Sequence, residues 1–169
     1  AACQIEFDHV KQALISAPVL AMPDFSLPFQ MYTDASVFGC GGILMQDGRV
    51  VAYCGKKFTG AQHNWTTTEQ ELYALVYALE TWRCYLEGTK VELFTDHQPL
   101  IWLATQPQLS RKQTRWVIFL QRFDVELKYV PGKVNPADPV SRASHLREII
   151  TPTDRIEEYD DICSYMTCR

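Results

Sequence analysis

The sequence contains no apolar run that approaches the length of a membrane span. Its N-terminus lacks the charged-then-apolar pattern of a secretory signal, and there is no internal repeat apart from two similar strand ends described below. These absences argue against a membrane protein, a secreted protein and a repeat array. We therefore expect a soluble, intracellular protein.

Closely spaced cysteine pairs are also absent. The six cysteines are scattered and none forms a CxxC motif, which argues against a zinc site and against a disulfide framework. Cys163 and Cys168 lie close enough in the sequence to pair, but that spacing does not establish a disulfide. We expect reduced thiols in the core or on the surface.

The chain lacks the positive net charge that is typical of nucleic-acid-binding proteins, since its formal charge is −4. The acidity is uneven. Residues 143–169 hold three of the 16 basic and six of the 20 acidic side chains, which leaves 13 basic and 14 acidic side chains in residues 1–142. Without four carboxylates that are argued below to bind metal, this body carries +3. The net charge therefore does not exclude a polyanionic substrate.

Residues 29–36 contain a strand-like run that finishes at Asp34, and a glycine-rich segment follows. A similar run at residues 91–96 also finishes with an aromatic residue, a threonine and an aspartate, Asp96. Ligands of open α/β sheets bind beyond the carboxyl ends of parallel strands, so two parallel neighbours would bring both aspartates together. Two such charges repel unless a cation lies between them. The two runs therefore predict a shared cation site.

The composition and local signals predict one α/β domain. With 169 residues, 47% of them hydrophobic, the chain can bury a sizeable core. The Asp47-Gly48 pair predicts a hairpin. Thr66 and Glu69 predict a capping box at the start of a helix, and Gly88 is placed to end that helix. The expected elements are strands 29–35, 41–46 and 49–54, helix 66–87, strand 90–96, a short helix 97–104, helix 110–123, strand 125–129 and a last helix that begins at Asn135.

Two more carboxylates occupy informative positions. Glu71 falls beside the apolar stripe of helix 66–87, roughly 160° or more from Glu69, Glu80 and Glu87 at the opposite edge of that stripe. Asp138 falls in the first turn of the last helix. Taken singly, such residues are more often caps, turn residues or solvated side chains. Together with Asp34 and Asp96 they offer hard oxygen ligands for Mg²⁺ or Mn²⁺, and two such ions support phosphodiester hydrolysis.

Several short motifs follow one another in a specific order over residues 6–142. They are Phe7-Asp-His-Val-Lys11, Ala17-Pro-Val-Leu20, Pro28-Phe29, Tyr32-Thr-Asp34-Ala-Ser36, Thr68-Glu-Gln-Glu71-Leu-Tyr-Ala74, Trp82-Arg83, Tyr85-Leu-Glu-Gly88, Thr95-Asp-His97, Pro99-Leu100, Arg115-Trp116 and Asn135-Pro-Ala-Asp138-Pro-Val-Ser-Arg142. In this order the chain resembles the ribonuclease H domain of gypsy-type long-terminal-repeat retrotransposon Pol polyproteins.

The resemblance implies a ribonuclease H-like fold, a five-stranded mixed sheet whose first three strands are antiparallel, flanked by helices. It implies an endonuclease that hydrolyses the RNA strand of an RNA–DNA hybrid with two Mg²⁺ ions, or with Mn²⁺ as a substitute. By resemblance, Asp34, Glu71, Asp96 and Asp138 correspond to the family's metal-binding catalytic residues. In that family pattern Asp34 bridges both ions, Glu71 and Asp96 hold the ion on the leaving-group side, and Asp138 holds the ion that activates water.

The resemblance also implies how the chain is organised. Residues 1–28, an amphipathic helix pattern followed by a proline-punctuated stretch, are expected to connect from a preceding reverse transcriptase region. Residues 29–142 would be the ribonuclease H domain, and residues 143–169 an acidic tail or tether toward an integrase. The expected partners are the hybrid and the polymerase domain of the same polyprotein, in the cytoplasm, in a cytoplasmic virus-like particle or in the nucleus. The oligomeric state is not predicted.

The last helix departs from the family pattern at two positions. Pro139 stands where the family usually has alanine or a similar helix-compatible residue, and Val140 stands where it has leucine. With Asn135 as the N-cap, Pro139 would be the fourth helical residue. The helix would then lose one backbone hydrogen bond and hold Asp138 less firmly.

The loop before the last helix lacks a histidine that cellular relatives carry there and that is thought to help product release. Lys133 in this loop supplies positive charge but is a poor proton carrier near neutrality. His97, directly after Asp96, is the candidate auxiliary group. The alternative is that His97 only caps or hydrogen-bonds locally.

Positive charge gathers in residues 111–142, whose seven basic and three acidic side chains sum to +4. Such a patch suits a phosphate backbone, and an ordinary solvated helix face explains it equally well. By resemblance to retroviral domains, Thr66, Thr67 and Gln70, which precede Glu71, are expected to contact the DNA strand. Distinguishing RNA from DNA requires contacts to the 2′-hydroxyl, for which the backbone near Ala35 and Ser36 and the side chain of Ser36 are candidates. The candidate substrate contacts are Ser36, Thr66, Thr67, Gln70, Arg111, Lys112, Arg115 and Lys133.

Two other functions stay open. One is a non-catalytic ribonuclease H-like module, degenerate or taken over by a host, that binds a hybrid or a protein without cutting. The presence of all four carboxylates argues against decay, whereas Pro139 and the missing loop histidine keep this alternative open. The other is a metal-dependent DNA nuclease or integrase of the same fold class, which the order of the motifs disfavours.

Overall fold

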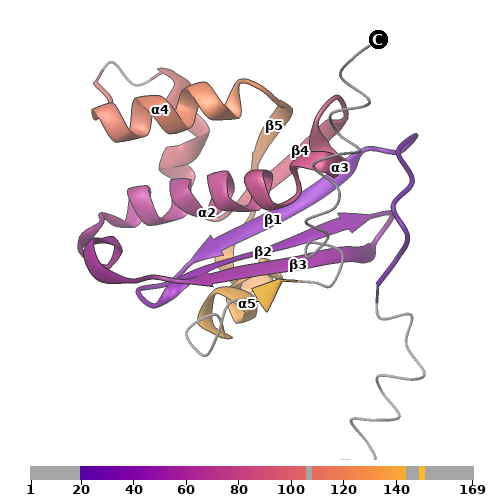
Figure 1. Cartoon of the computed structure of the whole chain (residues 1–169), viewed down its shortest axis with the longest axis horizontal. Helices are drawn as coiled ribbons and strands as arrows, with labels where there is room; N and C mark the ends of the chain where they lie inside the picture. Colours follow the sequence, from indigo (N-terminus) through magenta and orange to yellow (C-terminus); the bar gives the residue numbers. More distant parts are fainter. Residues whose placement is uncertain (1–19, 106–107, 144–148, 151–169) are drawn as a thin grey trace, which may run out of the picture.

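The computed structural model describes residues 20–105, 108–143 and 149–150. Its centre is a mixed sheet in the strand order β5-β4-β1-β2-β3-β6 (Figure 1). Strands β1, β2 and β3 are antiparallel, whereas β4 runs parallel to both β1 and β5. This confirms the predicted five-stranded mixed sheet. The strands are β1 (Phe29–Ala35), β2 (Gly39–Gln46), β3 (Arg49–Lys57), β4 (Lys90–Thr95), β5 (Asp124–Tyr129) and β6 (Ile149–Ile150).

Strand β6 was not expected from the sequence. It has two residues and pairs antiparallel with β3, where Ile150 lies opposite Cys54 and Ile149 opposite Gly55. These two residues belong to the predicted tail 143–169, so this part of the tail joins the sheet edge. The rest of residues 144–169, and the amphipathic helix predicted within residues 1–19, lie outside the described residues.

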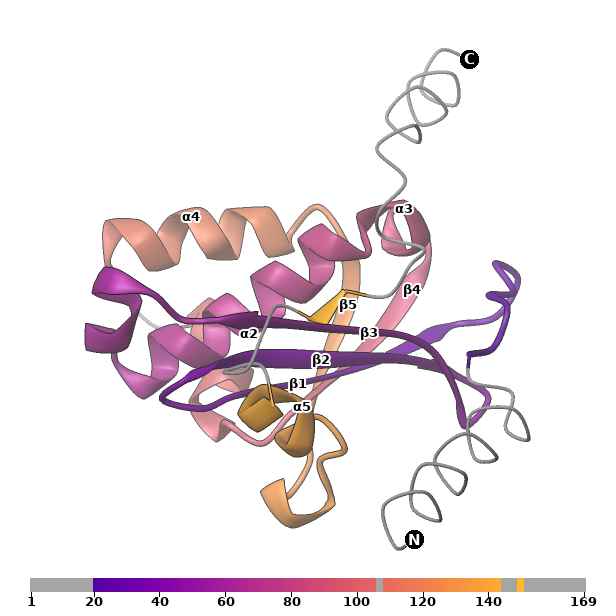
Figure 2. The same cartoon turned by 60° about the horizontal axis from the view of Figure 1, so that its bottom comes forward.

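Helices cover both faces of the sheet (Figure 2). The helices α2 and α4 lie over one face, and the short helix α5 packs against β1 and β2 on the other. In the described ranges, none of the helices has the length and apolar character needed to cross a membrane. The helical elements are η1 (Gly60–Asn64), α2 (Thr67–Thr81), α3 (Arg83–Leu86), η2 (Gln98–Thr105), α4 (Arg111–Leu120), η3 (Gly132–Val134) and α5 (Asp138–Ala143).

The core lies between the sheet and α2. Leu72, Leu75 and Leu79 of α2 are fully buried, as are Phe29 and Met31 of β1. This arrangement matches the helical spacing of the leucines and the alternation of the strand in the sequence. The face of α2 that carries these leucines is therefore fixed against the sheet.

Local turn and cap signals are confirmed. Asp47 (φ 48°) and Gly48 (φ 71°) both adopt positive φ, as the tight turn between β2 and β3 requires. At the start of α2, the Thr66 hydroxyl accepts a hydrogen bond from the Glu69 backbone N–H, and the Glu69 side chain accepts one from the Thr66 N–H. Gly88, with φ 82°, follows the last helical turn of this region.

The prediction of one continuous helix over 66–87 was wrong. The helix breaks at Trp82 (φ −104°, ψ 21°), which separates α2 from α3. Trp82 is fully buried, and a Cβ on Gly42 would lie 3.2 Å from its ring. We attribute the break to the packing of this large ring against the sheet, which helical spacing does not encode. The short helix expected at 97–104 is present as the 3₁₀ helix η2.

The last helix begins later than predicted. Helix α5 starts at Asp138, and the Asn135 side chain accepts a hydrogen bond from the Ala137 N–H at 3.1 Å instead of capping a helix that begins at Pro136. Pro139 is consequently the second helical residue, where a backbone N–H has no intrahelical acceptor. The expected loss of a hydrogen bond, and with it the looser hold on Asp138, does not follow.

Two adjacent glycines of β2 receive the helices of opposite faces. A Cβ on Gly41 would lie 2.5 Å from the Ser141 backbone nitrogen of α5, whereas a Cβ on Gly42 would lie 3.3 Å from the Ala78 Cβ of α2. Successive residues of a strand face opposite sides of the sheet, so Gly41 alone sets how closely α5 approaches. Gly41 also lies opposite Asp34 in the β1–β2 register.

We expect Gly41→Ala to push α5 off the sheet and to lower the free energy of unfolding by about 1–3 kcal/mol, because its Cβ would collide with helix backbone. Chemical denaturation measures the loss, and hydrogen exchange of the α5 amides locates it. Gly42→Ala is the matched control, since it disturbs the opposite face. Equal α5 exchange in the two variants would contradict this account.

Candidate metal centre

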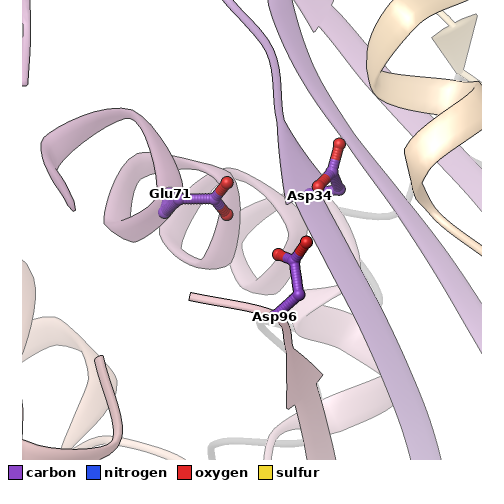
Figure 3. A group of neighbouring side chains, drawn as sticks. All are labelled: Asp34, Glu71 and Asp96. Atoms are coloured by element: carbon purple, nitrogen blue, oxygen red, sulfur yellow. The ribbon is translucent and has the colours of Figure 1, made fainter. Parts of the chain in front are cut away.

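Three of the four predicted carboxylates come together at one end of the sheet (Figure 3). Asp34 lies near the end of β1, Asp96 directly follows β4, and Glu71 lies in the second turn of α2. Because β1 and β4 are parallel neighbours, their carboxyl ends place the two aspartates side by side, as predicted. One carboxylate oxygen of each residue lies within 4.8 Å of those of the other two.

Two of the three carboxylates in the cluster are buried. The exposed fraction is 5% for Asp34 and 4% for Glu71, whereas Asp96 is half-buried. Burial, together with the charges of Asp96 and Asp138, raises the pKa of Asp34 to about 6, although a hydrogen bond from Ser141 opposes the rise. Burial likewise raises the pKa of Glu71 to about 9, reinforced by the charges of Asp34 and Asp96. The protein alone therefore does not compensate the negative charge of this site.

The hydrogen bonds leave part of the cluster unsatisfied. The Ala35 backbone N–H donates to Glu71 Oε1 at 3.2 Å, and the Ser141 hydroxyl donates to Asp34 Oδ2. Within the described part of the chain, the buried Glu71 Oε2 has no hydrogen-bond partner. A buried, unpartnered carboxylate oxygen beside two further carboxylates fits a divalent cation that prefers hard oxygen ligands, such as Mg²⁺ or Mn²⁺.

Asp138 lies near this cluster but outside it. It lines a cleft of about 450 Å³ together with Asp96, Lys133 and Arg142. Its carboxylate is held by Arg142, whose Nη2 lies 2.8 Å from Oδ1 and whose Nε donates to both oxygens at 3.0 Å. The structure thus brings Asp138 to the edge of the site, paired with a cation from its own helix.

Three residues that support the site were missed by reasoning from the sequence. Ser141 bonds Asp34, and the buried Asn135 donates from Nδ2 to the Thr33 carbonyl at 2.9 Å. Gly132 lies so close to Asp96 that a Cβ would come within 2.5 Å of Asp96 Oδ2. Asn135 and Ser141 belong to a motif that the sequence singled out, but nothing local shows that their side chains reach β1.

His97 makes local hydrogen bonds. Its Nε2 lies 2.9 Å from the Thr68 hydroxyl, and its backbone N–H donates to the Thr95 hydroxyl at 3.1 Å. Burial lowers the pKa of the imidazole, and the nearby Asp96 opposes this effect. The two hydrogen bonds agree with the alternative that His97 bonds locally, and its position directly after Asp96 places it beside the site.

Three of the predicted substrate contacts are engaged in the fold. Gln70 is buried and donates to the Gln62 carbonyl at 3.4 Å, while Thr66 caps α2. The Lys112 Nζ pairs with Glu69 at 2.8 Å and lies 4.2 Å from the ring centroid of Trp65. Lys112 thus joins α4 to the start of α2, while Gln70 and Thr66 make local contacts around that helix start, so the availability of these side chains to a ligand is limited.

The +4 charge predicted for residues 111–142 is partly neutralised. Arg122 pairs with Glu87, and Lys128 pairs with Glu92. In contrast, Arg111, Arg115 and Lys133 are exposed and form no ion pair among the described residues.

The two remaining predicted substrate contacts are uncharged. Thr67 is exposed. The half-buried Ser36 hydroxyl lies 3.2 Å from the carbonyl oxygens of both Gly39 and Ser141.

The raised pKa values predict that the metal-free chain loses stability as pH rises. Folded Asp34 and Glu71 keep protons that the unfolded chain has released above about pH 4, so the folded state binds more protons. With EDTA, the free energy of unfolding should fall as pH increases through about 6 for Asp34 and onward toward about 9 for Glu71. Chemical denaturation at about pH 5 and about pH 8 measures the fall.

Glu71→Gln should flatten this pH dependence, because it removes the group with the largest rise in pKa. Glu80→Gln, an exposed change on the same helix, is the matched control and should retain the wild-type slope. A Glu71→Gln profile parallel to that of the wild type would contradict the electrostatic account of the cluster.

Comparison with known protein families identifies the domain. Residues 24–123 match the family model described as the RNase H-like domain found in reverse transcriptase. The match includes Asp34, Glu71 and Asp96, and it ends before Asp138.

Related curated proteins are Pol polyproteins of transposons. The chain is 35% identical over 168 residues to the retrovirus-related Pol polyprotein from transposon opus of Drosophila melanogaster, covering 95% of this chain and 17% of that protein. It is 38% identical over 146 residues to the transposon Tf2-3 polyprotein of Schizosaccharomyces pombe, covering 80% of this chain and 11% of that protein. The chain thus spans less than a fifth of the length of these relatives.

Solved structures share the fold. RNase H1 from the halophilic archaeon Halobacterium salinarum has a TM-score of 0.54 at 21% identity, over 70% of this chain and 96% of that one. The foamy viral protease-reverse transcriptase in complex with RNA/DNA hybrid has a TM-score of 0.57 at 20% identity, over 78% of this chain and 19% of that one. The chain has the ribonuclease H fold and belongs to the family of RNase H-like domains found in reverse transcriptases.

Proposed function

We propose that this domain is a ribonuclease H that hydrolyses the RNA strand of RNA–DNA hybrids, as part of a retrotransposon Pol polyprotein. The observation that carries the proposal is the cluster of buried Asp34, buried Glu71 and half-buried Asp96, where α2 meets the carboxyl ends of the parallel strands β1 and β4. The family assignment supports it, and a related fold, LC11-RNase H1, has been solved in complex with an RNA/DNA hybrid.

In this proposal the four carboxylates would hold two Mg²⁺ ions, with Mn²⁺ as a substitute. Asp34 would serve both ions, Glu71 and Asp96 the one on the leaving-group side, and Asp138 the one on the side of the attacking water. When bound, two such ions activate water and stabilise the leaving oxygen of a phosphodiester. Glu71 contributes an oxygen that has no hydrogen-bond donor among the described residues.

Asp138 would have to exchange its ion pair with Arg142 for the metal. Both side chains are substantially exposed, with 71% for Arg142 and 38% for Asp138, and they lie one helical turn apart. Exposed pairs of this kind stabilise a helix only weakly, so the exchange costs little. The released Arg142 guanidinium would lie in the cleft lined by Asp96 and Asp138, where it could bind a phosphate of the substrate.

We propose that the substrate binds to basic side chains that are exposed and form no ion pair among the described residues. Arg111 and Arg115 are exposed on α4, and Lys133 lies in the cleft beside Asp96. Such side chains suit the phosphates of both strands, while Ser36, next to the metal site, suits a 2′-hydroxyl. The polymerase region of the same polyprotein is the proposed partner, joined through residues 1–28.

Asp34→Asn should reduce metal-dependent cleavage of a labelled RNA–DNA hybrid by about 100-fold or more, because it removes a charged ligand at the centre of the cluster. Product analysis on denaturing gels measures the loss and shows which strand is cut. Asp124→Asn, an exposed change at the start of β5, is the matched control and should cleave like the wild type.

Duplex DNA should remain uncut, since the proposal confines hydrolysis to the RNA strand of a hybrid. A wild-type chain that binds hybrid but does not cut it with Mg²⁺ or Mn²⁺ would contradict the proposal and support the non-catalytic module. Cleavage that Asp34→Asn leaves intact would place the activity elsewhere.

The double change of Arg111 and Arg115 to Gln should weaken hybrid binding through lost phosphate contacts. The slope of log affinity against log salt should become shallower by about 1–2, which fluorescence anisotropy in EDTA measures without cleavage. Arg49→Gln is the control, because Arg49 lies at the far end of β2 and β3 from Asp34. An unchanged salt slope in the double variant would remove α4 from the binding surface.

A further inference from the structure

The hydroxyl of Ser141 lies at the contact between α5 and the metal centre. Ser141 is fully buried, and its Oγ donates a hydrogen bond to Asp34 Oδ2. The same Oγ lies 3.0 Å from the Asp138 carbonyl oxygen one turn earlier in α5. One side chain therefore connects the strand that carries Asp34 with the helix that begins at Asp138.

The backbone around Ser141 fixes the position of this hydroxyl. Its N–H donates to the Ala137 carbonyl at 3.0 Å, and its carbonyl oxygen lies 3.2 Å from the Ser36 hydroxyl of the β1–β2 connection. On the other side, Gly41 allows the backbone of α5 to approach so closely that a Cβ there would clash. The helix is thus held by contacts independent of the hydroxyl, and the Ser141 side chain is set toward Asp34.

The orientation of Asp34 agrees with this role. Figure 3 shows one carboxylate oxygen of Asp34 turned toward Glu71 and Asp96 and the other turned toward the ribbon of α5. A hydrogen bond to one oxygen restricts rotation of the carboxylate and leaves the other oxygen available to a ligand. Without the hydroxyl, the carboxylate would sample orientations that do not face the cluster.

We propose that Ser141 is a positioning residue that holds Asp34 in the orientation required for metal binding. The inference rests on the proposed function, since it takes the carboxylate cluster as the metal site. Hydrogen bonds to metal-binding carboxylates of this kind change metal affinity by about 10–100-fold when they are removed. Helix α5 would then serve the site twice, by carrying Asp138 and by orienting Asp34.

The test measures Mn²⁺ binding to the full chain without hybrid, by electron paramagnetic resonance of the free ion. Ser141→Ala should raise the dissociation constant by about 10-fold. Ser141→Cys keeps the volume but offers only a weak donor, and it should weaken binding in the same direction. Thr89→Ala is the matched control, because it removes a half-buried hydroxyl that donates to helix carbonyls at the opposite end of β4 from Asp96. Its dissociation constant should stay within about two-fold of wild type.

Cleavage gives a second readout. The activity of Ser141→Ala should return toward that of wild type as Mn²⁺ is raised about 10-fold, with KM for the hybrid unchanged. A merely structural role for the hydroxyl would not produce this recovery. If Ser141→Ala and Ser141→Cys bind Mn²⁺ like wild type, or if Thr89→Ala loses as much affinity as they do, the positioning role is wrong. If wild type and Asp34→Asn both fail to bind, the metal site of the proposed function is wrong as well.

Discussion

The arrangement of this domain depends on the burial of carboxylates that repel one another. Asp34 and Glu71 are almost inaccessible, and their pKa values rise because burial and neighbouring negative charges both disfavour ionisation. Such a cluster persists only because the leucines of α2 and the apolar residues of the sheet hold its frame in place. The stability of the core thus sustains a local electrostatic cost that a bound cation would relieve.

Strand pairing and helix packing together assemble the carboxylate cluster. Parallel pairing of β1 with β4 aligns Asp34 and Asp96 at one edge, and α2 crosses this edge so that Glu71 meets the Ala35 backbone. On the opposite face, Gly41 admits α5, which brings Ser141 against Asp34. The site is therefore built from both faces of one sheet edge, and each helix contributes a different kind of group.

The cations of the domain divide into two groups. Lys112 pairs with Glu69 and lies over the ring of Trp65, and Lys128 pairs with Glu92. Arg111 and Arg115 extend from α4 without ion pairs in the described ranges. The weakly acidic chain can thus present basic side chains to a polyanion, because much of its remaining charge is paired internally.

The sequence by itself determined the elements that depend on local signals. The Asp47-Gly48 turn, the Thr66 capping box and the two strands that carry Asp34 and Asp96 near their ends follow from neighbouring residues. The shared site was predicted on the condition that these strands are parallel neighbours, and the sheet meets that condition. The tertiary structure alone decided contacts between distant segments, such as the hydrogen bond from Ser141 to Asp34 and the ion pair that holds Asp138 apart. It also decided the break at Trp82. These features depend on how closely packed surfaces approach, and a one-dimensional pattern of residues does not encode that distance.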